Sequence, residues 1–137
     1  MVVGQFTQDV DIVVIGAGPA GYTAAFRAAE LGKTVAIVDQ RAGLGGECLH
    51  KACIPTKAAH FNISNEQSTA SQETLVKGLE QRCKSLEIER LVGNAHFESG
   101  KSIQITGEVV SVVRFRKAII ATGSSTRPVD GDRCMQV

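Results

Sequence analysis

The sequence has no tryptophan, a single tyrosine and no excess of either charge. Its 15 basic and 14 acidic residues give a net charge of +1, which offers no support for a nucleic-acid or other polyanionic partner. No apolar run is long enough to cross a membrane, and residues 1–9 have neither the basic start nor the apolar stretch of a signal peptide. We therefore expect a cytoplasmic protein, or one of an organelle matrix if a transit peptide has been removed.

Cysteine is also scarce. The four cysteines, at positions 48, 53, 83 and 134, are too few for a secreted disulfide scaffold of this size, and their spacing matches no usual zinc pattern. We expect no metal site, and we interpret Cys83 and Cys134 as structural or incidental. With 137 residues, the chain is expected to form one domain, 1–137, that buries roughly two-thirds of its unfolded surface.

The first forty residues have the pattern of a strand, a helix and a second strand. Residues 10–15 are apolar and β-branched, residues 22–31 have helical periodicity and precede Gly32 as a C-cap, and residues 34–38 form another apolar run. Asp39 follows that second run, 23 residues after the first glycine of the turn that opens the helix. This is the context of a dinucleotide fingerprint. Its turn consists of Gly16, Ala17, Gly18, Pro19, Ala20 and Gly21.

Each part of the fingerprint has a physical task. Gly16 permits a tight turn, Gly18 lets the backbone approach a pyrophosphate, and Gly21 lets helix and strand pack closely. The helix N-terminus offers free N–H groups and a positive dipole end to phosphates, so no basic excess is needed. Asp39 can accept hydrogen bonds from both hydroxyls of an adenosine ribose and would repel a 2′-phosphate. The alternative is a structural turn with a solvated Asp39.

The rest of the chain predicts further helices and strands. Residues 58–74 are polar and predict a loop or linker, whereas apolar residues at helical spacing predict an amphipathic helix over 73–86. Short strands over 91–97, 102–106 and 109–116 are typical of a β-meander. A buried strand over 118–121 then runs into the turn Thr122-Gly123-Ser124, which in a parallel sheet lies at the ligand-binding carboxyl edge. The predicted class is α/β: a Rossmann-like, doubly wound parallel sheet with an added β-meander.

Two cysteines five residues apart, Cys48 and Cys53, precede Pro55. In an unbroken helix they would point roughly 140° apart, so a bridge requires a distorted first turn, which Pro55 favours. A strained bridge is more easily reduced, as a redox catalyst requires. If the helix is regular, the ammonium of Lys57 shares a face with Cys53 and would lower its thiolate pKa. Two buried structural cysteines with an incidental lysine are the alternative.

Together these motifs resemble the flavoprotein disulfide reductases, the class I FAD-dependent pyridine nucleotide-disulfide oxidoreductases. Dihydrolipoamide dehydrogenase, glutathione reductase and mercuric reductase belong to this family, and the Cys-Ile-Pro-Thr-Lys stretch is most similar to the dihydrolipoamide dehydrogenase branch. The resemblance covers nearly the whole chain as the family's N-terminal FAD-binding segment. It implies FAD as cofactor, NAD(P)H bound by a domain absent from this sequence, a dithiol or disulfide substrate such as a lipoyl group, and a homodimeric full-length enzyme.

The same resemblance assigns roles to individual residues. The glycine turn and Asp39 would hold the ADP half of FAD. Cys48 would exchange with the dithiol substrate, Cys53 would contact the flavin, and Lys57 would lie near flavin N5. The other cofactor contacts that it implies come from the stretch after the acid and from two later turns: Gln40, Arg41, Gly45, Gly46, Glu47, Cys48, Ala95, Thr122, Gly123 and Ser124.

The chain departs from the family pattern in three ways. It has His50 where the family has Asn, which we interpret as a residue without a role, and Ala52 where the family has Gly, which we expect to alter or impair the redox pair. The polar stretch 58–74 is shorter than its family counterpart. The family's NAD-binding domain, later FAD-binding strand and dimer domain are not represented, so the chain alone is expected not to complete a catalytic cycle.

Three functions remain open. The first is a segment of a disulfide oxidoreductase, including the glutathione and mercuric reductase types. The second is a truncated FAD- or ADP-binding module without turnover. The third, a plain NAD-binding Rossmann domain, would leave the cysteine pair and the 122–124 turn unexplained.

Overall fold

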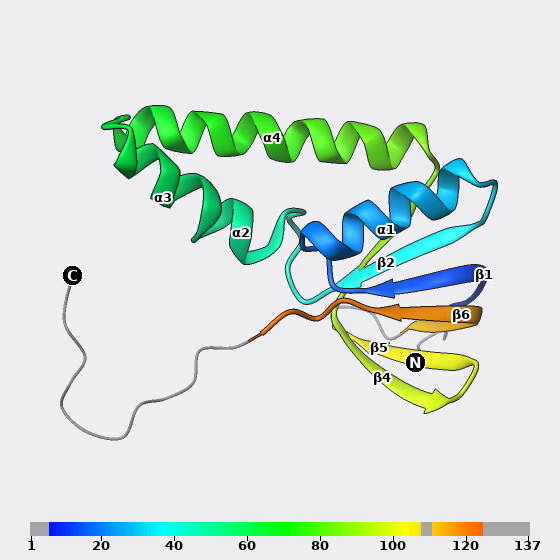
Figure 1. The fold of residues 1–137 in the computed structure, drawn as a ribbon. Helices are drawn as coiled ribbons and strands as arrows, with labels where there is room; N and C mark the ends of the chain where they lie inside the picture. The colour runs from blue at the N-terminus through cyan, green and yellow to red at the C-terminus, as the bar shows by residue number, and fades with distance from the viewer. Residues whose placement is uncertain (1–5, 108–110, 125–137) are drawn as a thin grey trace, which may run out of the picture.

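The computed structural model describes residues 6–107 and 111–124. Six strands form one sheet in the order β3-β2-β1-β6-β5-β4. α1 and α4 lie on one side of this sheet, while α2 and α3 lead away from its edge toward the far end of α4 (Figure 1). The elements are β1 (Phe6–Ile15), α1 (Pro19–Glu30), β2 (Val35–Asp39), α2 (Gly46–His50), α3 (Cys53–His60), α4 (Asn65–Ser85), β3 (Glu89–Val92), β4 (Asn94–Ser99), β5 (Ser102–Thr106) and β6 (Ser111–Ile120).

The sheet has a parallel part and an antiparallel part. β1 pairs in parallel with β2 and with β6, and β2 pairs in parallel with β3. β6, β5 and β4 form an antiparallel meander. The predicted α/β class with an added β-meander is therefore confirmed.

The predicted strand, helix and strand at the N-terminus are also confirmed, with shifted bounds. α1 begins at Pro19 rather than at residue 22, because a proline without an N–H fits the first helical turn. Gly32 follows the helix with φ of +74°, as its expected C-cap position requires. β1 begins at Phe6, four residues before the predicted start.

The prediction of a loop over residues 58–74 is wrong. α3 continues to His60, and α4 begins at Asn65 and runs 21 residues. Ser64 and Gln67 form a capping box, with the Gln67 N–H donating to Ser64 Oγ and the Ser64 N–H donating to the Gln67 side chain. The helix predicted over 73–86 is thus the second half of a longer one.

We expect Ser64→Ala to lower the free energy of unfolding by about 1 kcal/mol, because the Ser64 Oγ that accepts from the Gln67 N–H is lost. Ser71→Ala is the matched control, since the Ser71 hydroxyl donates only to the Gln67 carbonyl inside the exposed helix. Urea unfolding followed by circular dichroism measures both. Equal losses in the two variants would show that the cap contributes nothing.

Three predicted strands differ in the structure: one is divided and two are joined. The segment 91–97 is broken at Gly93, whose φ is +152°, so that β3 joins the parallel part and β4 begins the meander. The strands predicted over 109–116 and 118–121 are one strand, β6, that pairs with β1 along its whole length. Val109 itself lies outside the described residues.

Each face of the sheet carries its own apolar core. On the helix side, Phe26 of α1, Cys83 of α4 and Leu44 pack against Val14 and Ile37. On the other side, the meander contributes to a cluster formed with β1 and β2: Val10, Val13, Ala36, Val38, Ile103, Ile105, Val113 and Phe115. Both faces of β1 and β2 are therefore covered, which explains their continuous apolar sequence. None of the helices in the described ranges is long and apolar enough to cross a membrane.

Candidate functional site

The carboxyl ends of the parallel strands open into a cavity of about 1040 Å³. β1, β2 and β6 end at this edge, and α2 begins beside it (Figure 1). The lining comes from these strand ends, the glycine turn, the first turn of α2 and the start of β4: Ile15, Gly16, Gly18, Pro19, Ala20, Val38, Asp39, Gln40, Arg41, Gly43, Gly46, Glu47, Cys48, Lys51, Gly93, Asn94, Ala95, His96, Ala121, Thr122, Gly123 and Ser124.

The glycine turn is packed so tightly that side chains do not fit. Gly16 has φ of +107°, and a Cβ there would lie 2.2 Å from the Ala121 carbonyl oxygen. A Cβ on Gly21 would lie 1.8 Å from the Gly16 oxygen. Gly18 is the N-cap of α1 and has no side-chain cap. The N–H groups of the first helical turn are thus left for a ligand, and an anion suits them best.

Asp39 organises the turn as well as bordering the cavity. Its carboxylate accepts a hydrogen bond from the Ala17 N–H at 2.7 Å and another from the Arg41 N–H at 2.9 Å. The sequence pointed only to a contact between this acid and a ligand. A carboxylate has room for further hydrogen bonds beyond these two, so the structural task and the predicted ligand contact are compatible.

A disulfide joins Cys48 of α2 to Cys53 of α3, with Cα atoms 4.7 Å apart. The helix is interrupted between them, because α2 ends at His50 and α3 begins at Cys53. The predicted distorted turn is therefore confirmed. Ala52 has φ of −115°, outside the left-handed region, so the alanine takes this conformation without the freedom of glycine.

A second glycine pair docks the disulfide helix onto the first glycine turn. Gly45 and Gly46 have φ of +112° and +59°, and a Cβ on Gly46 would lie 2.7 Å from the Gly18 Cα. The Gly45 N–H donates to the Ala17 carbonyl at 2.9 Å. This contact of backbone against backbone places Cys48 at the wall of the cavity.

Three charged side chains form a cluster along α2. The Arg41 Nη2 is 2.5 Å from Glu47 Oε1, and the Lys51 Nζ is 3.5 Å from Glu47 Oε2. The hydrogen bond from Arg41 is the main cause that lowers the pKa of Glu47. His50 donates from Nε2 to the Leu44 carbonyl at 3.0 Å, so the interpretation of His50 as a residue without a role overlooked this tie to the loop.

Most of the predicted site residues meet at this one cavity. Those that line it are Gly16, Gly18, Pro19, Ala20, Asp39, Gln40, Arg41, Gly46, Glu47, Cys48, Ala95, Thr122, Gly123 and Ser124. Five predicted site residues do not line the cavity. Three of them are buried: Ala17, Gly21 and Gly45. The other two, Cys53 and Lys57, belong to α3 and are not buried. Sequence reasoning missed Lys51, Asn94 and His96. Their positions offered a signal, since Lys51 lies between the two cysteines and the other two flank Ala95.

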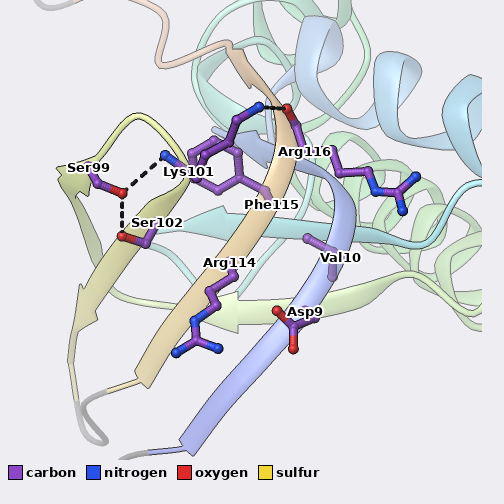
Figure 2. Close-up of a pocket in the computed structure, with 8 residues that line it drawn as sticks. All are labelled: Asp9, Val10, Ser99, Lys101, Ser102, Arg114, Phe115 and Arg116. Carbon is purple, nitrogen blue, oxygen red and sulfur yellow. Dashed lines mark hydrogen bonds between the residues drawn. The ribbon is translucent and has the colours of Figure 1, made fainter.

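A smaller hollow of about 500 Å³ lies at the other end of the sheet. Figure 2 shows its lining, which comes from Asp9 and Val10 in the middle of β1, from the β4–β5 turn and from the middle of β6. Lys101 Nζ donates to the Arg116 carbonyl at 2.7 Å, and the Ser99 and Ser102 hydroxyls are 2.8 Å apart. These polar groups hydrogen-bond to one another. None of the predicted site residues lines this hollow.

The third cysteine of the described part behaves as a structural residue. Cys83 is free and 1% exposed in the core under α4. Burial raises the pKa of its thiol, which keeps it protonated and unreactive. Cys134 lies outside the described residues. Within the two described ranges, no three side chains of the types that bind metals are grouped to hold an ion.

A family model described as "Pyridine nucleotide-disulphide oxidoreductase" matches residues 10–135. The chain is 36% identical to the dihydrolipoyl dehydrogenase of Geobacillus stearothermophilus, over 95% of this chain and 33% of that protein. It is 35% identical to the Bacillus subtilis dihydrolipoyl dehydrogenase, again over 95% of this chain and 33% of that protein. The chain thus spans about a third of the length of these curated relatives.

A solved structure shares the same fold. The HOCl-induced flavoprotein disulfide reductase RclA from Escherichia coli superposes with a TM-score of 0.77 and 26% identity, over 88% of this chain and 29% of that one. Its Cu(II) complex gives a TM-score of 0.72 with 27% identity, over 90% of this chain and 30% of that one.

Proposed function

Because the chain belongs to the pyridine nucleotide-disulphide oxidoreductase family, we propose that it holds FAD in the large cavity and carries the redox-active disulfide of a flavoprotein disulfide oxidoreductase. One observation carries the proposal. The dinucleotide turn, the acid after β2 and the first cysteine of a disulfide all border a single cavity of about 1040 Å³. A plain NAD-binding domain would not require a disulfide at that place.

The residues present fit a flavin dinucleotide. The uncapped first turn of α1 and the close contact of Gly18 with Gly46 form a backbone cradle that suits a pyrophosphate. Asp39 and Ala95 both line the cavity, and on this proposal Asp39 accepts hydrogen bonds from the ribose hydroxyls. When bound, FAD would supply two-electron chemistry between a nicotinamide and the disulfide.

The chain's own residues prepare the disulfide for exchange. The family resemblance, and not the cavity lining, leads us to assign Cys48 the exchange with a dithiol substrate and Cys53 the contact with the flavin. Cys48 lines the cavity and is half-buried, and the disulfide joins it to Cys53. Lys57 is exposed on α3, and its predicted place near flavin N5 stays a proposal. Thr122, Gly123 and Ser124 form the third wall, after the end of β6.

The substrate proposed is a lipoyl dithiol, because curated relatives at 35–36% identity are named dihydrolipoyl dehydrogenases. On this proposal the whole enzyme is a cytoplasmic or matrix homodimer that uses NAD(P)H through a further domain. The structural match with a flavoprotein disulfide reductase favours the same chemistry with a different disulfide as the alternative. A FAD-binding module without turnover is the second alternative.

Titration of the purified chain with FAD tests the cofactor proposal. We expect a bound-flavin absorption spectrum, and we expect Asp39→Ala to weaken binding about tenfold, because a charged acceptor of hydrogen bonds is lost. Asp9→Ala, at the far end of β1, is the matched control and should bind as the unsubstituted chain does. A folded chain that binds no flavin would contradict the proposal, as would equal weakening by the two substitutions.

A further inference from the structure

Lys51 is held beside Cys48 by the covalent structure of the site. It lies inside the six-residue ring that the disulfide closes between positions 48 and 53. Its N–H donates to the Glu47 carbonyl at 2.8 Å, which fixes its backbone at the end of α2. Cys48 and Lys51 both line the large cavity, whereas Lys57 does not. Lys51 is therefore the lysine placed on the cavity side of the disulfide.

The ammonium of Lys51 is only loosely engaged in the oxidised state. Its carboxylate partner, Glu47, is 3.5 Å away, beyond a good hydrogen bond, and is held at 2.5 Å by Arg41 on its other oxygen. The side chain of Lys51 is 66% exposed, so little holds it in one rotamer. A new negative charge nearby would compete with Glu47 for this ammonium.

Reduction creates such a charge. When the disulfide gains two electrons and two protons it becomes two thiols, and the Cys48 thiol can then release its proton to solvent. We propose that Lys51 stabilises the Cys48 thiolate in the reduced state, and that Glu47, by competing for Lys51, weakens this stabilisation. Lys51 and Glu47 would thus tune, through their charges, the nucleophile that exchanges with the substrate.

Other charged groups also surround Cys48. Asp39, Arg41 and His96 line the same cavity, His50 is tied to Leu44, and Lys57 and His60 lie on α3. The carboxylate of Asp39 is engaged by two backbone amides, and Arg41 is engaged by Glu47. Lys51→Gln leaves these groups unchanged, whereas Glu47→Gln also releases Arg41, so Lys51→Gln is the variant that isolates the effect of the lysine.

The test measures thiolate formation directly and does not require flavin. The full chain is reduced with a water-soluble phosphine, which becomes the phosphine oxide while water supplies the oxygen and both thiol protons. Limiting iodoacetamide then labels the thiolates across a range of pH, and peptide mass spectrometry reads Cys48 separately from Cys53. Failure of FAD binding would leave this measurement untouched, so the inference and the proposed function are tested apart.

We expect opposite shifts from the two charges. Lys51→Gln should raise the midpoint of the Cys48 labelling profile by about half a pH unit, and Glu47→Gln should lower it by a similar amount. At pH 7 the labelling rate should fall about twofold in Lys51→Gln, because a more basic thiolate is scarcer but somewhat more nucleophilic. Lys51→Arg should keep the labelling profile of the unsubstituted chain, because the positive charge is retained. Lys77→Gln is the control: it removes the charge of an exposed lysine of α4 and should leave the profile unchanged.

Shifts of the same sign in Lys51→Gln and Glu47→Gln would overturn the proposal, since a purely structural pair would act that way. Unchanged profiles in both variants would also overturn it. If Lys51→Gln fails to fold, Lys51→Met takes its place: a raised midpoint is again the expected result, and an unchanged midpoint overturns the proposal.

Discussion

Replacing Gly21 with alanine is expected to lower the free energy of unfolding by roughly 3 kcal/mol or more, enough to leave much of the chain unfolded. The added Cβ would lie 1.8 Å from the Gly16 oxygen and 2.9 Å from the Gly16 carbonyl carbon. Both are backbone atoms of a turn that is itself wedged against Ala121. Neither side can yield without moving α1 away from β1, so the substitution should also abolish flavin binding.

Gly78→Ala is the matched control for this substitution. Gly78 also lies inside a helix, α4, but nothing comes within 4 Å of the position that its Cβ would occupy. Alanine there should raise stability by about 0.5–1 kcal/mol through helix propensity alone. Urea unfolding followed by circular dichroism compares the two variants. A Gly21→Ala chain as stable as Gly78→Ala would mean that the turn and helix do not pack as described.

The glycine turn and the disulfide could be predicted from sequence because local rules govern both. The spacing of Gly16, Gly18 and Gly21 between an apolar strand and a helix has few physical meanings. A pair of cysteines five residues apart with Pro55 behind them likewise requires a break in the helix, and the structure has that break between His50 and Cys53. The gathering of distant turns at one cavity followed from the parallel order of the strands.

The start of α4 could not be predicted from apolar periodicity because its first half buries almost nothing. Ser68 is the one buried side chain between Ser64 and Gln72, and Leu75 is 45% exposed although it fits the helical pattern. This half is defined by its capping box, with Ser64 and Gln67 three residues apart, a signal that was present in the sequence. Polar composition was mistaken for the absence of structure.

The division of residues 91–97 depended on tertiary context. Apolar content predicted one strand, but Gly93 turns the chain, and its Cβ would lie 2.6 Å from the Thr106 oxygen. β3 thereby pairs in parallel with β2, and β4 starts the antiparallel meander. The charge cluster of Arg41, Glu47 and Lys51 was equally hidden, because only the fold brings Arg41 to the start of α2.

Replacing Cys53 with serine is expected to remove all reversible two-electron uptake by the disulfide. Replacing Cys83 with alanine should leave this uptake intact. Cys53→Ser breaks the bridge to Cys48, and Cys83 is free and buried in the helix-side core. Loss of so small a ring should lower stability by only about 2 kcal/mol, so the Cys53→Ser chain should stay folded. Counting alkylated thiols by mass, before and after reduction with a dithiol, measures the difference.

The two cysteines of the bridge should also differ from each other once flavin is bound. If Cys53 is the residue that faces the flavin, Cys48→Ser leaves a Cys53 thiolate that gives a long-wavelength absorption band without any reductant. Cys53→Ser leaves only Cys48, so it should show no such band even after reduction, while Cys83→Ala should match the unsubstituted chain. A band that persists in Cys53→Ser would reverse the assignment, placing Cys48 against the flavin and Cys53 in the exchange with substrate.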